Sequence, residues 1–380
     1  MSKKQMALDM EKASEIDTLG GEFSEAFDEI QKLPNRLDRL GRAKRASDET
    51  IQYGYSFLNG ERDTDQILQS DLGPVLRRME GCAEWLRFRY YYTADRVRLG
   101  NMHTCQVPLL CQFCAVLRAG KQLRAYFERF NFLMSGHPNL KPYLLTLTVA
   151  NGQDLEERQK HLQDSFKIYC NRRRTYFKNG RGFNEFCKIM GAVFTYEVTC
   201  SRKDSSWHPH IHAIVLVDEN NPIDFPHKGT DKQKKSSKLS QEWYAITGDS
   251  YIVDCRPLSE NPMDGFVEVF KYTLKFSEMH NWDKYQAYFI LRGKRLIGSF
   301  GLFRGVKIPE NEADTMPADL PYVEMIYRFG GNGYEIFHVG QRAVMGGVEL
   351  PGNVRSFVPM PTDGYTSPDG EFQPFRRRSS

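Results

Sequence analysis

The eleven residues Trp207–Val217, WHPHIHAIVLV, carry three histidines at alternate positions and end in an apolar run of β-favouring residues. Because side chains alternate between the two faces of a strand, His208, His210 and His212 should share one face. Imidazole is the commonest metal ligand in proteins, so three imidazoles side by side on a strand favour a metal site. A half-exposed strand with its polar residues in solvent is the alternative that needs no metal.

The segments around this strand follow strand and helix periodicities in a regular order. Strands are expected over Tyr143–Val149, Ala192–Cys200 and Ser250–Cys255, and helices over Gly120–Met134, Asp154–Lys178, Leu239–Ile246 and Met263–Glu278. The order strand, helix, hairpin, helix, strand, helix is typical of an antiparallel sheet with helices on one face. The sequence therefore predicts an α+β fold.

Composition divides the 380 residues into four regions. Residues 1–100 have apolar positions at helical spacing over Leu19–Arg45 and Asp65–Val97, which predicts a helical accessory or DNA-binding region. Residues 101–305 contain the strands and helices named above and would form the main domain. Residues 306–350 would form a β-containing extension with a hairpin across Gly330–Gly333. Residues 351–380, rich in Pro, Gly, Ser and Arg, are expected to be a disordered tail.

Hydropathy argues against a membrane protein, and the charge permits a nucleic-acid partner. No apolar run reaches membrane-spanning length, and the charged start, MSKKQMALDMEKASEIDT, lacks the core of a signal peptide, so a cytoplasmic location is expected. The net charge is only +4. Local clusters provide candidate contacts to DNA phosphates, with a solvated face as the alternative reading; they include Arg172, Arg173, Arg174, Lys234 and Lys235.

A carboxylate falls opposite the histidines if Ala192–Cys200 and the histidine strand form a hairpin. With Cys200 facing Trp207, Glu197 pairs with His210. Directly opposed residues of an antiparallel pair share a face, with Cβ atoms roughly 5 Å apart. A slip of one residue would turn Glu197 to the other face, where it would be an exposed strand carboxylate.

Glu197, His210 and His212 are therefore the expected ligands of one divalent ion. His208 is the alternative third ligand. Two imidazoles and a carboxylate suit Mn²⁺ or Mg²⁺ in an open site that leaves room for substrate oxygens. A closed structural zinc site would be expected to use cysteines instead.

The expected helix Met263–Glu278 carries three residues suited to phosphoryl chemistry. Glu268 and Tyr272 are four residues apart, and Lys275 follows three later, so all three lie along one side. The tyrosine would be the nucleophile, the glutamate a base for a second hydroxyl or water, and the lysine a partner for phosphate oxygens. Packing with a surface ion pair is the alternative for this segment taken alone.

Three of the eight cysteines lie close together in the sequence. Cys105, Cys111 and Cys114 include one CxxC pair, and a tetrahedral zinc site needs a fourth ligand, for which His103 and Cys82 are the candidates. A structural Zn²⁺ ion is one interpretation. Buried, reduced cysteines that serve as small apolar residues are the other.

Together the motifs resemble those of plasmid rolling-circle replication initiators, members of the HUH endonuclease superfamily. Leu144–Val149, LLTLTV, is similar to the family's first motif, and His210-Ile211-His212 to its metal-binding motif. Glu268 and Tyr272 are similar to the glutamate and tyrosine that one branch carries on its catalytic helix, and the three clustered cysteines resemble a cysteine-rich segment before the first motif. The resemblance covers roughly residues 100–305.

The resemblance implies a ferredoxin-like palm that nicks single-stranded plasmid origin DNA within a double-stranded origin. Tyr272 would form a 5′-phosphotyrosine intermediate and free a 3′-OH primer, and Glu268 would act in termination. Host helicase and DNA polymerase are the implied partners. A transposase or relaxase of the same chemistry is one alternative, and a nucleic-acid-binding module without catalysis is another.

Overall fold

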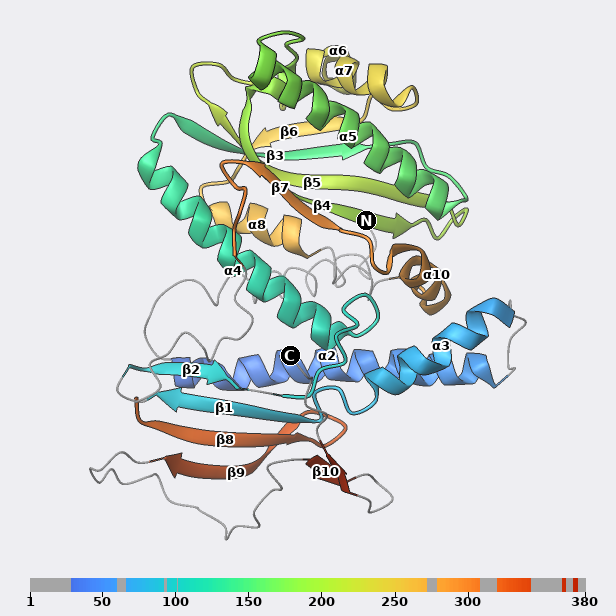
Figure 1. Ribbon diagram of the computed structural model, residues 1–380, viewed down its shortest axis with the longest axis vertical. Helices are drawn as coiled ribbons and strands as arrows, with labels where there is room; N and C mark the ends of the chain where they lie inside the picture. The colour runs from blue at the N-terminus through green and yellow to red at the C-terminus, as the bar shows by residue number, and fades with distance from the viewer. Residues whose placement is uncertain are drawn as a thin grey trace.

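The computed structural model describes residues 29–59, 66–91, 94–100, 102–271, 279–307, 320–342, 364–366 and 372–374. These residues form two main antiparallel sheets with helices packed around them, which confirms the predicted α+β class (Figure 1). The larger sheet has the strand order β6-β3-β5-β4-β7. Its strands are β3 (Leu140–Thr148), β4 (Ile189–Cys200), β5 (Trp207–Asp218), β6 (Val253–Pro257) and β7 (Ile297–Gly301).

Helices cover both faces of this five-stranded sheet. One face packs against α5 (Leu155–Asn179) and α7 (Lys238–Thr247), and the other against α4 (Gln112–Gly136) and α8 (Pro262–Phe270). The expectation of helices on one face is therefore wrong. Leu144 and Leu145 show the reason, because these neighbours on β3 are both buried, each in the core on its own side. A strand covered on both faces has a continuous apolar run, such as the one that ends β5.

Local sequence signals set the ends of the helices that frame the sheet. The Asp154 side chain accepts a hydrogen bond from the Glu157 backbone N–H at 3.0 Å, and α5 ends at Gly180 in the left-handed conformation. Asn261 caps α8 in the same way, with Pro262 in its first turn. These caps fix the direction in which each helix crosses the sheet.

Aromatic packing holds α8 against α4 on one face of the sheet. The ring centroids of Tyr126 and Phe270 are 5.5 Å apart, and those of Phe130 and Phe266 are 5.1 Å apart. The Thr195 hydroxyl of β4 donates to the Val269 carbonyl at 2.8 Å, which ties α8 directly to the sheet. The predicted helix Met263–Glu278 is thus present as far as Phe270, and residues 272–278 lie outside the described part of the chain.

The regions at the two ends of the chain share a second sheet of order β2-β1-β8-β9. Its strands are β1 (Trp85–Tyr91), β2 (Arg96–Leu99), β8 (Tyr322–Phe329) and β9 (Tyr334–Arg342), and the helices α2 (Glu29–Leu58) and α3 (Gln66–Met79) share a core with it. The predicted hairpin across Gly330–Gly333 is confirmed. The helix expected over Asp65–Val97 is wrong beyond α3, because WLRFRYY alternates buried and half-exposed side chains as a strand does.

The remaining described elements are short. They are the 3-10 turn η1 (Glu185–Lys188), α6 (Asp231–Ser236), α10 (Asn281–Leu291) and the strand pair β10 (Gly364–Thr366) and β11 (Phe372–Pro374). Apart from that pair, the expected disordered tail at 351–380 lies outside the described residues. Among the helices the structure describes, none has the length and apolar character needed to cross a membrane.

Candidate metal centre and active site

The hairpin of β4 and β5 has the register that the sequence predicts. Cys200 pairs with Trp207, and Glu197 pairs with His210. The turn between the strands is closed by a 2.8 Å hydrogen bond from the Ser201 backbone N–H to the Ser206 carbonyl. Glu197 and the histidines therefore share one face, the face that α4 and α8 cover.

Glu197, His210 and His212 form a compact group of metal-ligating atoms. Nε2 of His210 is 3.1 Å from Oε1 of Glu197, and Nε2 of His212 is 3.6 Å from Oε2. One ligand atom from each residue lies within 4.8 Å of the other two. Three ligand atoms this close together, from two rigid strands, form a group that can hold a single metal ion.

Neighbouring groups orient both imidazole rings toward the carboxylate. Nδ1 of His210 lies 3.2 Å from the His208 carbonyl oxygen, and Nδ1 of His212 lies 3.0 Å from the Thr146 hydroxyl. Metal-binding histidines usually donate from the second ring nitrogen to a neighbour in this way, which leaves the first nitrogen as a ligand. Glu197 is only 1% exposed, and a buried carboxylate requires a cation or several donors nearby. The donor set and its burial thus fit a divalent ion.

His208 lies beside this group but is not part of it. Its Nδ1 contacts the Asn151 side-chain oxygen, beyond the end of β3. The ring centroids of His208 and His210 are 5.2 Å apart. The structure therefore groups Glu197 with the two later histidines, and places His208 at the rim.

Glu268 reaches the same group from α8. Its Oε1 lies 3.9 Å from Nε2 of His212, and its other oxygen forms a close ion pair with the Lys271 ammonium. Lys271 was not predicted as a site residue, although its position three residues after Glu268 on a helix is a signal for such a pair. Tyr272 and Lys275 lie outside the described residues, and Tyr272 follows Lys271 directly in the chain.

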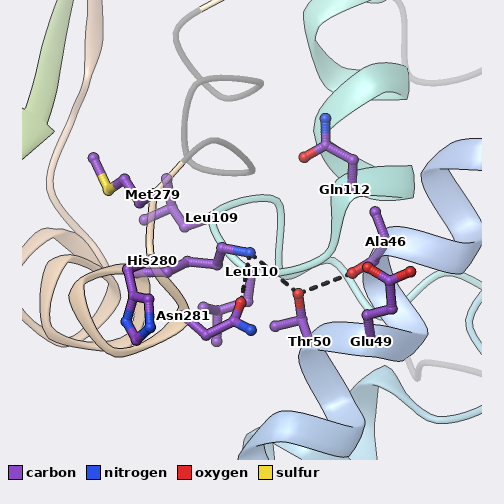
Figure 2. A pocket seen from close by; sticks show the side chains of 10 residues that line it. Ala46, Glu49, Thr50, Leu109, Leu110, Gln112, Met279, His280 and Asn281 are labelled. Atoms are coloured by element: carbon purple, nitrogen blue, oxygen red, sulfur yellow. Dashed lines mark hydrogen bonds between the residues drawn. The ribbon is translucent and has the colours of Figure 1, made fainter. Parts of the chain in front are cut away.

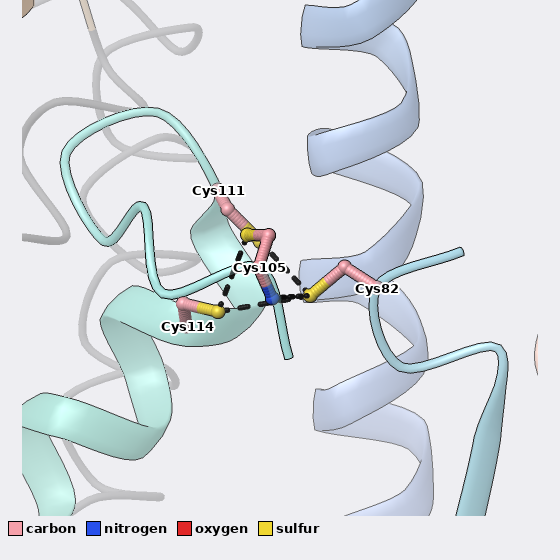
Figure 3. Close-up of side chains that lie close together, drawn as sticks. All are labelled: Cys82, Cys105, Cys111 and Cys114. Atoms are coloured by element: carbon pink, nitrogen blue, oxygen red, sulfur yellow. Dashed lines mark hydrogen bonds between the residues drawn. The ribbon is translucent and has the colours of Figure 1, made fainter. Parts of the chain in front are cut away.

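Four buried cysteines form a second group of possible metal ligands (Figure 3). The sulfur of Cys82 is 3.6 Å from those of Cys111 and Cys114, and the sulfurs of Cys105 and Cys114 are 3.5 Å apart. Of the two candidates for the fourth position, Cys82 joins the group. Nδ1 of His103 instead lies 3.1 Å from the Gly81 carbonyl oxygen.

Hydrogen bonds within the cysteine group favour a negative charge on one sulfur. The bond from the Cys105 thiol, followed by those from Cys114 and Cys82, lowers the pKa of Cys111 well below its usual range. The Ser47 hydroxyl of α2 also lies 3.5 Å from the Cys111 sulfur. Thiolate is the form of cysteine that binds metals.

The predicted DNA-contacting residues differ in their surroundings. Arg172 and Arg174 are exposed on α5, which covers the opposite face of the sheet. The guanidinium of Arg173 donates at 2.7 Å to the Ile189 carbonyl and stacks on Phe300, so its role is within the fold. The Lys234 ammonium lies 3.8 Å from an Asp254 carboxylate oxygen, and Lys235 is exposed.

A pocket of about 300 Å³ that the sequence did not signal lies between α2, the start of α4 and α10 (Figure 2). Lys284 lines it and is buried, with its ammonium 3.1 Å from the Asn281 side-chain oxygen and 3.3 Å from the Thr50 hydroxyl. Burial lowers the pKa of Lys284, and the nearby Glu49 partly opposes this shift.

Comparisons with known proteins identify relatives of this chain. A family model described as "Replication protein" matches residues 96–325. "Protein rep" of Streptococcus pneumoniae serotype 2 is 25% identical over 258 residues, which cover 65% of this chain and 76% of the relative. A "Replication protein" of Staphylococcus aureus is 27% identical over 214 residues, which cover 52% of this chain and 86% of the relative. No solved structure matches the chain significantly. Since the family model matches more than half of the chain and includes Glu197, His210 and His212, the chain belongs to the replication protein family.

Proposed function

We propose that this protein initiates rolling-circle plasmid replication by nicking one DNA strand at the origin with a tyrosine nucleophile and a divalent metal ion. The observation that carries the proposal is that the ligand group on the sheet and the carboxylate of Glu268 on α8 lie next to each other. Glu197 and two imidazoles form a ligand group on the sheet, and Glu268 of α8 lies 3.9 Å from His212. Membership of the replication protein family supports the same function.

Glu197, His210 and His212 would hold Mn²⁺ or Mg²⁺, because the mixed imidazole and carboxylate donors leave open positions for phosphate oxygens. The bound ion would supply Lewis-acid polarisation of the scissile phosphate. The contacts of His208 with Asn151 and of His212 with Thr146 orient the rings at the edge where a DNA strand would enter. Two ligands on one strand and one directly opposite keep this geometry rigid.

Tyr272 is the proposed nucleophile. Its phenol oxygen would form a bond to phosphorus while the bond from phosphorus to the 3′ oxygen breaks, which leaves a 5′-phosphotyrosine and a 3′-OH. The phenol gives up its proton to a base or solvent, and the leaving 3′ oxygen takes one up. Lys275 would neutralise charge on the non-bridging oxygens. The free 3′-OH would then serve a host polymerase, with a host helicase to open the duplex.

Glu268 is the proposed base for the second cleavage. A carboxylate beside His212 can take a proton from water as that water attacks the regenerated origin. Lys271 holds Glu268 in place through its ion pair. The 3′-OH freed by this hydrolysis would then attack the phosphotyrosine, form a phosphodiester bond and release the tyrosine, which frees the enzyme from DNA and suits termination.

The decisive experiment is relaxation of a supercoiled plasmid that carries the origin, with Mn²⁺ or Mg²⁺. Wild-type protein should convert it to the nicked form, and His210→Ala should not. Tyr272→Phe should abolish the covalent protein–DNA adduct. A protein that binds the plasmid but never nicks it would support a non-catalytic binding module. Nicking with an adduct that persists in Tyr272→Phe would assign the nucleophile to another tyrosine.

For the cysteine group we propose a structural Zn²⁺ ion with Cys82, Cys105, Cys111 and Cys114 as ligands. A tetrahedron with Zn–S distances of about 2.3 Å has sulfurs about 3.8 Å apart, close to the 3.5–3.6 Å between the sulfurs here. Four thiolates with no open position are the donor set of a closed structural site. Its ligands come from the turn after α3, the loop between β2 and α4 and the start of α4, so the ion would join the accessory helices to a helix of the main domain.

A further inference from the structure

The four-stranded sheet β2-β1-β8-β9 has one face in the core with α2 and a second face that carries arginines and aromatic rings, with Tyr91, Tyr322 and Ile326 buried among them. The inward side chains share a core with α2; they are Leu86, Phe88, Val97, Leu99, Val323, Met325 and Tyr327. Because strand side chains alternate, the residues between them point to the other side of the sheet. We refer to this second side as the outer face.

The outer face carries an excess of positive charge. Its positions on β1, β2 and β8 include five arginines and the carboxylate of Glu324, while Glu335 of β9 pairs with Arg328 in the register and a Glu84 oxygen lies 3.9 Å from the Arg328 Nε. A single oxygen of Glu324 serves both Arg87, at 3.7 Å from Nε, and Arg89, at 3.9 Å, so neither pair is tight. The other outward arginines are Arg96, Arg98 and Arg328.

Two of these arginines oppose each other directly across β1 and β2. Arg89 pairs with Arg98 in the register, and like charges in such positions reduce the stability of a sheet. The side chains of Arg87, Arg89 and Arg328 remain 38%, 31% and 59% exposed. The paired arginines place positive charge on adjacent strands, an arrangement that attracts a polyanionic partner.

Aromatic rings lie among the arginines on the same face. Trp85 and Phe337 are in edge contact with centroids 4.8 Å apart, and the Arg328 guanidinium lies 5.3 Å from the Trp85 ring. Phe337 is 47% exposed, which is unusual for phenylalanine on a strand. Rings beside guanidinium planes form a platform on which unpaired bases can stack. An acidic protein or a membrane surface presents no bases to stack there.

We propose that the outer face of β2-β1-β8-β9 binds single-stranded DNA, with the arginines on phosphates and the rings on bases. A DNA duplex fits this surface poorly. Its major groove is about 12 Å wide and admits a two-stranded β-ribbon, whereas the four β-strands of this sheet span about 14 Å. The proposal rests on the proposed function in one respect, that the partner is DNA. It adds a binding surface that is separate from the metal-binding group.

The test measures binding of a fluorescein-labelled 20-nucleotide DNA strand by anisotropy, in buffer without added Mn²⁺ or Mg²⁺ so that no cleavage takes place. Arg87→Gln/Arg89→Gln should weaken binding about tenfold near 0.1 M salt and reduce the slope of log K against log salt by about 1.4, or 0.7 for each lost phosphate contact. Arg87→Lys/Arg89→Lys should restore most of the slope because it keeps the charge. Phe337→Ala should weaken binding about fivefold with the slope unchanged.

The matched control is Lys178→Gln/Arg181→Gln, which removes two exposed charges at the end of α5. It should bind like wild type, and all variants should match wild type in thermal unfolding. Equal loss in the control, or wild-type affinity in the Arg87/Arg89 variant, would overturn the proposal. Because binding is measured without Mn²⁺ or Mg²⁺, a protein that fails to nick DNA can still pass this test, so each proposal can fail without the other.

Discussion

Glu197 and His210 lie directly opposite each other on β4 and β5, and their side chains meet at 3.1 Å although both are almost fully buried. Two neutral imidazoles and a carboxylate would present lone pairs to one another at this point. A divalent cation converts that repulsion into coordination, so the ion should bind where these side chains meet.

Removal of the Glu197 carboxylate should weaken metal binding. Glu197→Gln keeps the shape of the side chain but removes its charge, so affinity for Mn²⁺ should fall at least about 100-fold, as measured by calorimetric titration. Glu156→Gln is the control, because Glu156 is an exposed carboxylate on α5. Equal Mn²⁺ affinity in wild type and Glu197→Gln would exclude Glu197 as a ligand.

Glu268 should be needed in the second cleavage and not in the first. Glu268→Ala should slow hydrolytic cleavage of the regenerated origin about 100-fold, the range for loss of a general base, and leave formation of the covalent adduct within about threefold of wild type. Single-turnover assays on an origin oligonucleotide separate the steps. If both steps slow equally, Glu268 acts in metal binding or positioning instead of as a base.

Zinc content distinguishes the candidate fourth ligands of the cysteine group. Purified protein should contain one Zn²⁺ per chain by mass spectrometry, Cys82→Ser should lose it, and His103→Ala should keep it. Loss of the ion should lower the unfolding temperature by roughly 10 °C or more, because structural zinc contributes directly to folding.

Cys187→Ser is the control for that experiment. Cys187 is buried but outside the group, and its thiol contacts the Asn184 side-chain oxygen at 3.4 Å, a contact that serine can keep. Zinc retained in Cys82→Ser but lost in His103→Ala would assign the fourth position to the histidine.

Lys284 should give stability a distinct dependence on pH. Burial lowers its pKa in the folded protein below the ordinary value of about 10.4, so the unfolded chain binds more protons between the two pKa values. The contribution of Lys284 to the free energy of unfolding should therefore rise as pH increases through that interval. Lys284→Met should be more stable than wild type at pH 7, and urea unfolding at pH 7 and pH 10 should show the difference narrowing. A difference that widens with pH would contradict this assignment.

The sequence predicted those parts of the fold and site that depend on local periodicity. Alternation placed the histidines on one face, and the polar turn before Trp207 set the register that brings Glu197 to His210. The helix expected through Val97 was wrong because β1 pairs with β8, and nothing local to WLRFRYY signals a partner so distant in the chain.

The sequence also could not decide between Cys82 and His103 as the fourth zinc ligand. Only the folding of the turn after α3 back onto α4 brings the Cys82 sulfur to the other cysteines. The Glu268–Lys271 ion pair could have been predicted from the sequence, because both residues lie in one helical turn.

The pairing of Trp85 with Arg328 has a consequence for how the protein is made. All five strands of the larger sheet lie between these two residues in the chain. During synthesis, β1 and β2 leave the ribosome long before β8 exists, and domains generally fold as units as they emerge. The larger sheet can therefore fold first. Until β8 is made, the edge of β1 that later pairs with it stays unpaired. Exposed strand edges promote aggregation. The cysteine group is complete as soon as Cys114 is made, so it can hold α3 and the first hairpin against the start of α4 until β8 is synthesised.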